Sequence, residues 1–308
     1  MNDSNIQKFS TRSIHSGHDV QATAGTRAVP IYQSTSYVFH DCDHAANLFN
    51  LSEPGYIYTR LNNPTTDILE KRMADLEGGI GALCTSSGMS AISTTILTLL
   101  KSGDHIVASN SLYGGTFLES LGNPKLDVPD IKKIADVAKG LDIPLIVDNT
   151  VATPYLLRPI EYGANIVVHS LTKYINGNGT SIGGIIIDAG TFNWNNEKFP
   201  EFNEPSPGYH GLVYNEQIGQ AAFIAKARLE GLRDFGAALS PFNAFQILQG
   251  LETLEIRVKK HSENSLVLAK WLEAQEEVQW VNYPGLESSP YFEVASEYMP
   301  NGQSGIVT

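Results

Sequence analysis

Cysteine is scarce in this sequence of 308 residues, because only Cys42 and Cys84 are present. Their spacing matches neither a zinc site nor a disulfide framework, so we interpret both as structural thiols. The sequence also lacks an apolar run of the roughly 20 residues that a membrane-spanning helix needs. These absences exclude a disulfide-stapled domain and disfavour a transmembrane protein, and we expect no bound metal.

The sequence has fewer basic than acidic residues. It contains 21 Lys and Arg and 33 Asp and Glu, which gives a formal net charge of −12. This charge repels the phosphates of nucleic acids, although a local positive pocket can still bind a phosphate monoester. The N-terminal segment MNDSNIQKFSTRSIHSGHD has no apolar stretch behind a basic one and is not Arg-rich, so it indicates neither a secretory signal nor a transit peptide. We therefore expect a cytoplasmic protein that binds neither nucleic acid nor a membrane.

Short apolar runs alternate with helical segments through the middle of the chain. The strand-like runs are 105–109, 144–150, 165–170 and 183–188. Two segments have helical spacing, 63–79 and 128–141. Thr66 or Asp67 can cap the first helix. The alternation predicts an α/β domain with a mostly parallel sheet. Asp148 follows the apolar residues of the run 144–150 and Lys173 follows the run 165–170, so both should lie at the edge where such sheets bind ligands.

We divide the chain into an N-terminal arm (1–57), a large cofactor-binding domain (58–240) and the start of a smaller C-terminal α+β domain (241–308). In the last part, 241–275 predicts one long helix, or two with the break at Gly250, and 278–285 predicts the start of a second sheet. The chain ends in an apolar, strand-like run at 304–308 with no partner after it, so we expect the C-terminal domain to be incomplete.

Three polar features fall where this fold would bring chemical groups together. Small residues at 85–90 (TSSGMS) turn the chain into an apolar helix, and the free N–H groups of a helix start bind phosphate. Asp148 closes an apolar strand, so its carboxylate should face a cation or solvent. Lys173 precedes a glycine-rich segment that indicates unusual backbone freedom. Taken singly, the first two features are more typical of a helix cap and a solvated loop carboxylate, and a single lysine is equally typical of a surface charge.

Taken together, the three features meet the requirements of pyridoxal phosphate. This cofactor needs a lysine for covalent attachment, a carboxylate that keeps the ring nitrogen protonated, and phosphate donors from amides and hydroxyls. A dinucleotide fold would instead need G-x-G-x-x-G after its first strand, and the sequence does not supply that motif in that setting.

Four segments resemble the cysteine and methionine metabolism family of pyridoxal-phosphate enzymes, and within that family the likeness is closest to the O-acetylhomoserine sulfhydrylases. The segments are TSSGMSA, YGGT, VDNTVATPYL and VHSLTKYINGNGTSIGG. The resemblance covers nearly the whole chain. It implies the type I, aspartate-aminotransferase-like fold of pyridoxal-phosphate-dependent transferases.

The resemblance also implies the site residues. Lys173 would hold the cofactor, Asp148 would pair with the ring nitrogen, and Tyr113 would stack on the ring. The other cofactor-binding residues would be Gly88 and Met89 (backbone N–H groups to the phosphate), Ser170 and Thr172 (hydroxyls to the phosphate), Asn123 (near the ring 3′-oxygen), and Tyr58 and Arg60 (at the phosphate of the neighbouring subunit). The active sites would then be shared within a homotetramer built of dimers.

The chain departs from the family at two places. Thr116 runs directly into Phe117, where the family has several tens of further residues, so we expect a segment to be missing from this join. Without that segment, Tyr113 could hardly lie over the ring. The family also continues past residue 308, and the arginine that binds the substrate carboxylate lies in that continuation.

The activity that the resemblance implies is a γ-replacement in methionine biosynthesis, in which O-acetyl-L-homoserine and sulfide, or a thiol, give L-homocysteine and acetate. Cystathionine γ-synthase and the γ-lyases are alternatives that share every cofactor residue, although YGGT lacks the cysteine expected of methionine γ-lyase. A non-catalytic scaffold of the same fold is a further alternative, which the presence of Lys173 and Asp148 disfavours. The acyl group on homoserine and the form of the sulfur donor stay open.

Overall fold

The structure, a computed structural model, describes residues 7–109 and 118–308. Tyr113 and the join between Thr116 and Phe117 therefore lie outside the described residues. The strands are β1 (Gly81–Thr85), β2 (Ile146–Asp148), β3 (Ile166–Ser170) and β4 (Gly184–Asp188). The α-helices are α1 (Phe9–His15), α2 (Cys42–Phe49), α3 (Pro64–Glu77), α4 (Gly88–Leu99), α5 (Ile131–Gly140), α6 (Thr153–Leu156), α7 (Tyr214–Gln217), α8 (Ala222–Lys226), α9 (Arg233–Phe235), α10 (Pro241–Leu251), α11 (Leu254–Glu273) and α12 (Phe292–Tyr298). The remaining helical segments are η2 (Gln21–Thr23), η3 (Pro159–Tyr162), η4 (Pro200–Phe202), η5 (Gly219–Ala221) and the π-helical η6 (Ala227–Leu232).

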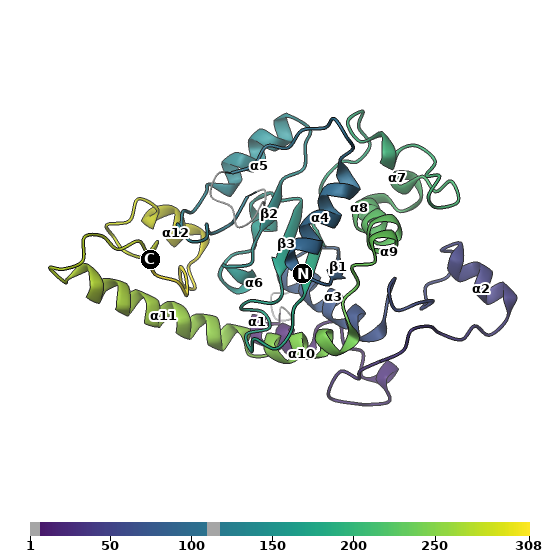
Figure 1. Cartoon of the computed structure of the whole chain (residues 1–308), viewed down its shortest axis with the longest axis horizontal. Coiled ribbons are helices and arrows are strands. Elements are labelled where there is room, and N and C mark those ends of the chain that lie inside the picture. Colours follow the sequence, from purple (N-terminus) through teal and green to yellow (C-terminus); the bar gives the residue numbers. More distant parts are fainter. Residues whose placement is uncertain (1–6, 110–117) are drawn as a thin grey trace.

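The sheet has the strand order β1-β4-β3-β2 (Figure 1). β2 and β3 are parallel, whereas β4 is antiparallel to both β1 and β3. The prediction of a mostly parallel sheet therefore holds for β1, β2 and β3, which point the same way, and is wrong for β4. The connection explains the difference, because the 171–183 loop contains no crossover helix and a parallel neighbour would need one.

The run 105–109 was predicted as a strand and is not one in the structure. Val107, in the middle of the run, is 89% exposed. The run has the composition of a buried strand, but it is irregular in the structure.

Helices cover both faces of the sheet. α3, with α10 beside it, lies on one face, and α4 lies on the other with the continuous helix that α8, η6 and α9 form (Figure 1). Successive strand residues face opposite layers, so Val147 and Val167 belong to the core under α3, whereas Ile146 and Ile166 belong to the core under α4.

Helix α3 begins earlier than predicted. Its N-cap is Asn63, whose side chain accepts a hydrogen bond from the Thr65 N–H at 2.9 Å. Thr66 and Asp67 therefore lie inside the first turn and do not cap it. Pro64 explains the shift, since proline favours the first helical position.

The segment 241–275 contains two helices, and Gly250 is not the break between them. Glu252 and Thr253 separate α10 from α11. Gly250 instead allows a close approach, since a Cβ there would lie 1.8 Å from the Asn176 carbonyl oxygen. The predicted strand at 278–285 is not formed within the described residues.

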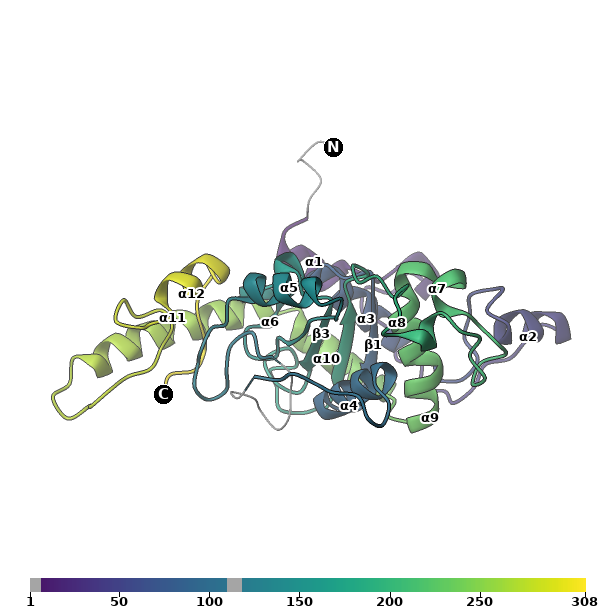
Figure 2. The same ribbon diagram turned by 90° about the horizontal axis from the view of Figure 1, so that it is seen from above.

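At the end of the chain Asn282 and Thr308 exchange two backbone hydrogen bonds, with N···O distances of 2.6 and 3.2 Å. This C-terminal part projects from one end of the molecule (Figure 2). No strand is assigned around the pair, so the start of a second sheet predicted at 278–285 is not formed.

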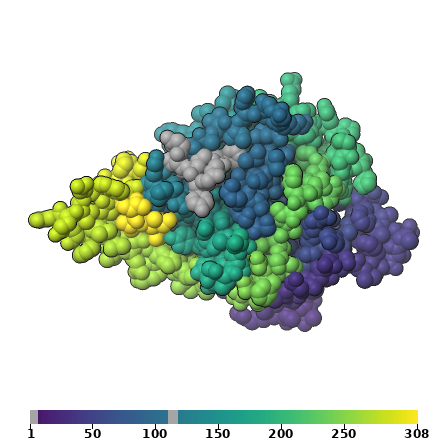
Figure 3. Space-filling view, in the orientation of Figure 1, coloured from purple at the N-terminus to yellow at the C-terminus, as the bar shows by residue number. Residues whose placement is uncertain are grey.

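The N-terminal part is only partly an arm. α1 packs against α3 and α11, and Arg12 forms an ion pair with Asp75 at 2.8 Å. The segment around α2 extends at the end opposite to the C-terminal part (Figure 3). Among the described helices, none is long and apolar enough to cross a membrane.

Candidate active site

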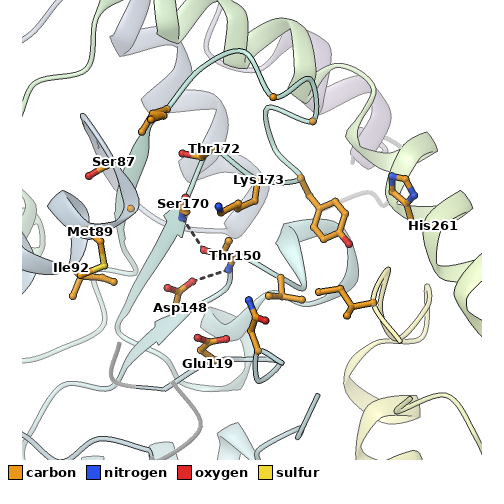
Figure 4. Close-up of a pocket in the computed structure, with 18 of the residues that line it drawn as sticks. Ser87, Met89, Ile92, Glu119, Asp148, Thr150, Ser170, Thr172, Lys173 and His261 are labelled. Carbon is orange, nitrogen blue, oxygen red and sulfur yellow. Dashed lines mark hydrogen bonds between the residues drawn. The ribbon is translucent and has the colours of Figure 1, made fainter. Parts of the chain in front are cut away.

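Three strands end at the same edge of the sheet. Thr85, Asp148 and Ser170 are the last residues of β1, β2 and β3, and β4 begins there at Gly184, opposite Thr85 and Ser170. A cavity of about 670 Å³ opens at this edge (Figure 4). Its size is typical of a small-molecule site.

The start of α4 forms one wall of the cavity. The Ser87 side chain caps the helix by accepting a hydrogen bond from the Ser90 N–H at 3.1 Å. Gly88 and Met89, the first two helical residues, line the cavity, and N–H groups in a first turn have no acceptor inside the helix. A Cβ on Gly88 would lie 2.7 Å from the Ser170 Cβ, so the wall has no room for a larger residue. This helix start can receive an anionic group.

Asp148 extends into the cavity from the end of β2 (Figure 4). Its Oδ1 accepts a hydrogen bond from the Thr150 N–H at 2.9 Å, and Thr150 Oγ1 accepts one from the Ser170 N–H at 2.8 Å. Burial raises the pKa of the Asp148 carboxyl, and the bonds to Thr150 and the nearby His169 oppose that rise. A cation in the cavity would stabilise the ionised carboxylate further.

Lys173 follows β3 in a turn and extends into the same cavity (Figure 4). The turn is held from within, because the Lys173 N–H donates to the Ser170 carbonyl at 3.3 Å and the Gly177 N–H donates to the Lys173 carbonyl at 2.8 Å. Thr172 Oγ1 also donates to the Gly183 carbonyl at 3.2 Å and accepts from the Gly183 N–H at 3.1 Å. The result is a long, flexible amine on a fixed loop.

Most of the residues predicted from the sequence line this cavity: Gly88, Met89, Asn123, Asp148, Ser170, Thr172 and Lys173. Tyr113 falls among the residues that the structure does not describe. Tyr58 and Arg60 are not among the lining residues. The Arg60 guanidinium lies 5.5 Å from the centre of the Tyr58 ring and donates to the Arg233 carbonyl at 2.8 Å. Their role at a neighbouring subunit stays a prediction.

The sequence matches the family described as Cys/Met metabolism PLP-dependent enzymes, over residues 10–118 and 116–308. The chain belongs to this family. The two matched stretches meet at the join where the sequence predicts a missing segment. That segment and the domain boundaries at residues 57 and 240 stay predictions.

Similar proteins in the same family carry related names. The chain is 48% identical to an O-acetyl-L-homoserine sulfhydrylase of Leptospira meyeri, over 97% of this chain and 78% of that protein. It is 46% identical to a homocysteine synthase of Schizosaccharomyces pombe, over 98% of this chain and 80% of that protein.

A solved structure from Campylobacter jejuni, assigned as an O-acetylhomoserine (thiol)-lyase (metY), superimposes with a TM-score of 0.93. The two chains are 38% identical, and the match covers 98% of this chain and 84% of the other. That structure contains N′-pyridoxyl-lysine-5′-monophosphate, so in it the cofactor is joined to a lysine. The fold of this family member is therefore that of the pyridoxal-phosphate-dependent transferases.

Membership makes the protein a pyridoxal-phosphate enzyme, and the residues of the cavity fit that cofactor. The glycine forced at position 88 leaves backbone N–H groups open to a phosphate. Asp148 is a buried carboxylate that a protonated ring nitrogen would stabilise. Lys173 is a primary amine in the same cavity, as covalent attachment requires. We infer that these three residues hold the phosphate, the ring nitrogen and the aldehyde carbon.

Arg257 lies on α11 and lines the cavity, although the sequence alone does not mark it as a site residue. Its guanidinium donates to the carbonyl oxygens of Tyr174 at 2.7 Å and Gly250 at 2.8 Å, and to Thr253 Oγ1 at 3.0 Å. The side chain also fills the space beside Gly177, where a Cβ would lie 2.3 Å from Nη1. Arg257 therefore binds the backbone that follows Lys173, and most of its donors are already used.

The sequence does not predict several other lining residues, among them Glu119, Thr150, Tyr174, His261 and Ile306. A local signal was present for Thr150, since it stands two residues after Asp148. His261 follows Arg257 at the four-residue spacing that shares one helix face, but this spacing alone does not show that the face meets a cavity.

Proposed function

We propose that this enzyme replaces the acetate of O-acetyl-L-homoserine with sulfide, forming L-homocysteine and acetate. The C–O bond at the γ-carbon breaks as acetate leaves, and a C–S bond forms at the same carbon. The observation that carries the proposal is the 48% identity to an O-acetyl-L-homoserine sulfhydrylase over 97% of this chain. It is supported by the convergence of Lys173, Asp148 and the start of α4 on one cavity.

When bound, the cofactor supplies an electron sink for the charge that develops on the substrate α- and β-carbons. Asp148 would keep the ring nitrogen protonated, and Gly88 and Met89 would hold the phosphate through their N–H groups. Lys173 Nζ would take the protons from the α- and β-carbons one after the other and return protons to these carbons after sulfide has added. A lysine suits this task because its long stem lets one amine reach adjacent carbons, and positioned side chains contribute about 10²–10⁴-fold to such transfers.

We also propose a cytoplasmic homotetramer built of dimers, with Tyr58 and Arg60 reaching the phosphate site of the neighbouring subunit and Tyr113 stacking on the ring. The exposed position of Tyr58, at 41% of its full surface, leaves its ring available to a partner. Sedimentation of the full-length protein would measure the assembly, and a stable, cofactor-loaded monomer would contradict it.

The test is a steady-state assay of the purified full-length protein with O-acetyl-L-homoserine and sulfide, in which homocysteine, acetate and ammonia are measured together. Equal amounts of homocysteine and acetate, abolished in Lys173→Ala, are expected. Ammonia without homocysteine would make the enzyme a γ-lyase, and homocysteine only from another acyl ester would correct the substrate.

A further inference from the structure

A cluster of fully buried polar side chains lies behind the edge of the sheet that carries the cavity. It consists of Glu77, Ser120, Asn149 and His169, each with no exposed surface. His169 immediately precedes Ser170 on β3, and Asn149 immediately follows Asp148 on β2. Because side chains alternate along a strand, His169 faces α3, which ends at Glu77. The cluster and the cavity are thus on opposite faces of the same two strands.

The cluster is centred on one oxygen of Glu77. His169 Nε2 lies 2.6 Å from Glu77 Oε1, and Asn149 Nδ2 donates to the same oxygen at 2.7 Å. Ser120 Oγ donates to Asn149 Oδ1 at 2.7 Å, which fixes the orientation of the amide. An ionised carboxylate only accepts hydrogen bonds, so it suits both neighbours, and a buried carboxylate needs a positive partner. His169 is the group in contact that can supply the charge.

We propose that Glu77 holds His169 as an imidazolium, and that this buried cation is a positioning group that keeps the Asp148 carboxylate ionised toward the cofactor ring nitrogen. The inference rests on the proposed placement of Asp148 at that nitrogen. A positive charge behind the carboxylate stabilises the arrangement in which Asp148 is negative and the ring nitrogen carries the proton. It disfavours the alternative in which the proton has moved to Asp148.

The surroundings of Asp148 agree with this role. Burial raises the pKa of its carboxyl, and the groups that oppose this are Thr150, through hydrogen bonds, and His169, through its charge. Lys173 and Asp148 line the same cavity, on the face of the sheet opposite to His169. Glu119 forms an isolated parallel bridge with Asp148. His169 is therefore the cation that β3 itself places beside Asp148, whatever covalent state Lys173 has.

The pair also has a feature that stability alone does not explain. Glu77 Oε2 and His169 Nδ1 are buried and have no hydrogen-bond partner in the described part of the chain. Buried ion pairs with incomplete hydrogen bonding are often no more stable than an apolar replacement. An electrostatic action on Asp148 gives a reason for keeping one here.

The direct test uses the holoenzyme loaded with ring-¹⁵N pyridoxal phosphate, whose ¹⁵N chemical shift reports protonation of the ring nitrogen without turnover. Glu77→Gln keeps the shape and an acceptor oxygen but removes the negative charge that holds the proton on His169. We expect the ratio of protonated to unprotonated ring nitrogen to fall by about tenfold, which corresponds to the loss of one nearby charge. The matched control is Glu230→Gln, which weakens the 2.5 Å ion pair with Lys226 and should leave the ratio unchanged.

A protonated ring nitrogen in the wild type that is unchanged in folded Glu77→Gln would overturn the inference and leave the proposed function standing. An unprotonated ring nitrogen in the wild type would overturn the placement of Asp148 as well.

A second measurement does not depend on a folded Glu77 variant. The chain has 8 histidines, and the ¹⁵N signals of His169 in the wild-type holoenzyme can be assigned by their loss in His169→Gln or, failing that, by their contacts to neighbouring residues. Protons on both ring nitrogens near neutral pH are the expected result. A neutral imidazole there would refute the proposal.

Discussion

Gly88 and Ser170 approach each other so closely that a Cβ on Gly88 would lie 2.7 Å from the Ser170 Cβ and 3.0 Å from its Cα. This contact joins the start of α4 to the end of β3. Gly88→Ala should therefore push the two apart and open the place where we expect the phosphate. Overpacking of this kind costs about 1–3 kcal/mol, so the affinity for pyridoxal phosphate should fall about ten- to hundredfold. Fluorescence titration of the apoenzyme measures it.

Gly140→Ala is the control for this substitution. Gly140 is the last residue of α5, and a Cβ there would meet nothing within 4 Å. Its cofactor affinity should equal that of the wild type. Equal affinities for both variants would show that the narrow contact at Gly88 does not shape the phosphate site.

Arg257 offers a second test, because it binds the Tyr174 carbonyl directly after Lys173. Arg257→Lys keeps the positive charge but loses the planar guanidinium, whose several N–H groups donate to different acceptors at once. If the loop shifts, kcat should fall on the order of 10²-fold, as for a small misplacement of a reacting group. The control is Lys260→Met, since Lys260 lies on the same helix in an exposed ion pair with Glu263. A wild-type kcat for Arg257→Lys would mean that the loop holds Lys173 in place without the hydrogen bonds of Arg257.

The parts of the site that the sequence predicts are those whose signals are local. Asp148 follows the apolar residues of one strand-like run and Lys173 follows another, so short-range patterns suffice to put both at one edge, and 85–90 is marked by the apolar helix that it precedes. A parallel sheet then gathers them without further information. The same logic finds the helix that starts at Pro64, although the choice of cap missed Asn63.

The parts that the sequence does not predict depend on contacts between distant segments. Arg257 meets the backbone of Tyr174 across 83 residues, and no periodicity along the chain reports such a meeting. From the sequence Gly250 looks like a helix break, whereas in the structure a glycine is needed there because the Asn176 carbonyl lies too close for a side chain. The reversed direction of β4 likewise follows from the path of a loop and not from the composition of the strand.

A buried ion pair between Arg228 and Glu70 should contribute strongly to stability. Arg228 Nη2 lies 2.6 Å from Glu70 Oε2, and the other Glu70 oxygen accepts the Cys84 N–H at 2.8 Å. Arg228→Met would leave a buried carboxylate without its cation, which costs about 3–5 kcal/mol of the free energy of unfolding. Adding Glu70→Gln should restore part of it, because the remaining charge is removed. Urea unfolding of the single and double variants measures this, and a double variant no more stable than Arg228→Met would contradict it.

Asp188, the last residue of β4, predicts a pH dependence of stability. Burial raises the pKa of its carboxyl from 3.8 to about 6, against the hydrogen bonds from the Gly190 and Ile224 N–H groups. Between these two values the native state holds a proton that the unfolded chain has lost. The stability that this proton supplies is therefore present at low pH and falls as pH rises through about 6, by about 3 kcal/mol in total.

Asp188→Asn should remove this dependence, because the amide does not ionise. Relative to the wild type, the variant should gain about 3 kcal/mol in the free energy of unfolding between about pH 4 and pH 7. Asp130→Asn is the control of opposite sign. Lys133 and Tyr298 hold the pKa of Asp130 at about 2, so its variant should lose stability relative to the wild type as pH rises from strongly acidic values. If urea unfolding gives Asp188→Asn and the wild type parallel profiles, the Asp188 carboxyl already ionises at its ordinary pH in the native state, and a water or a local opening must compensate for its burial.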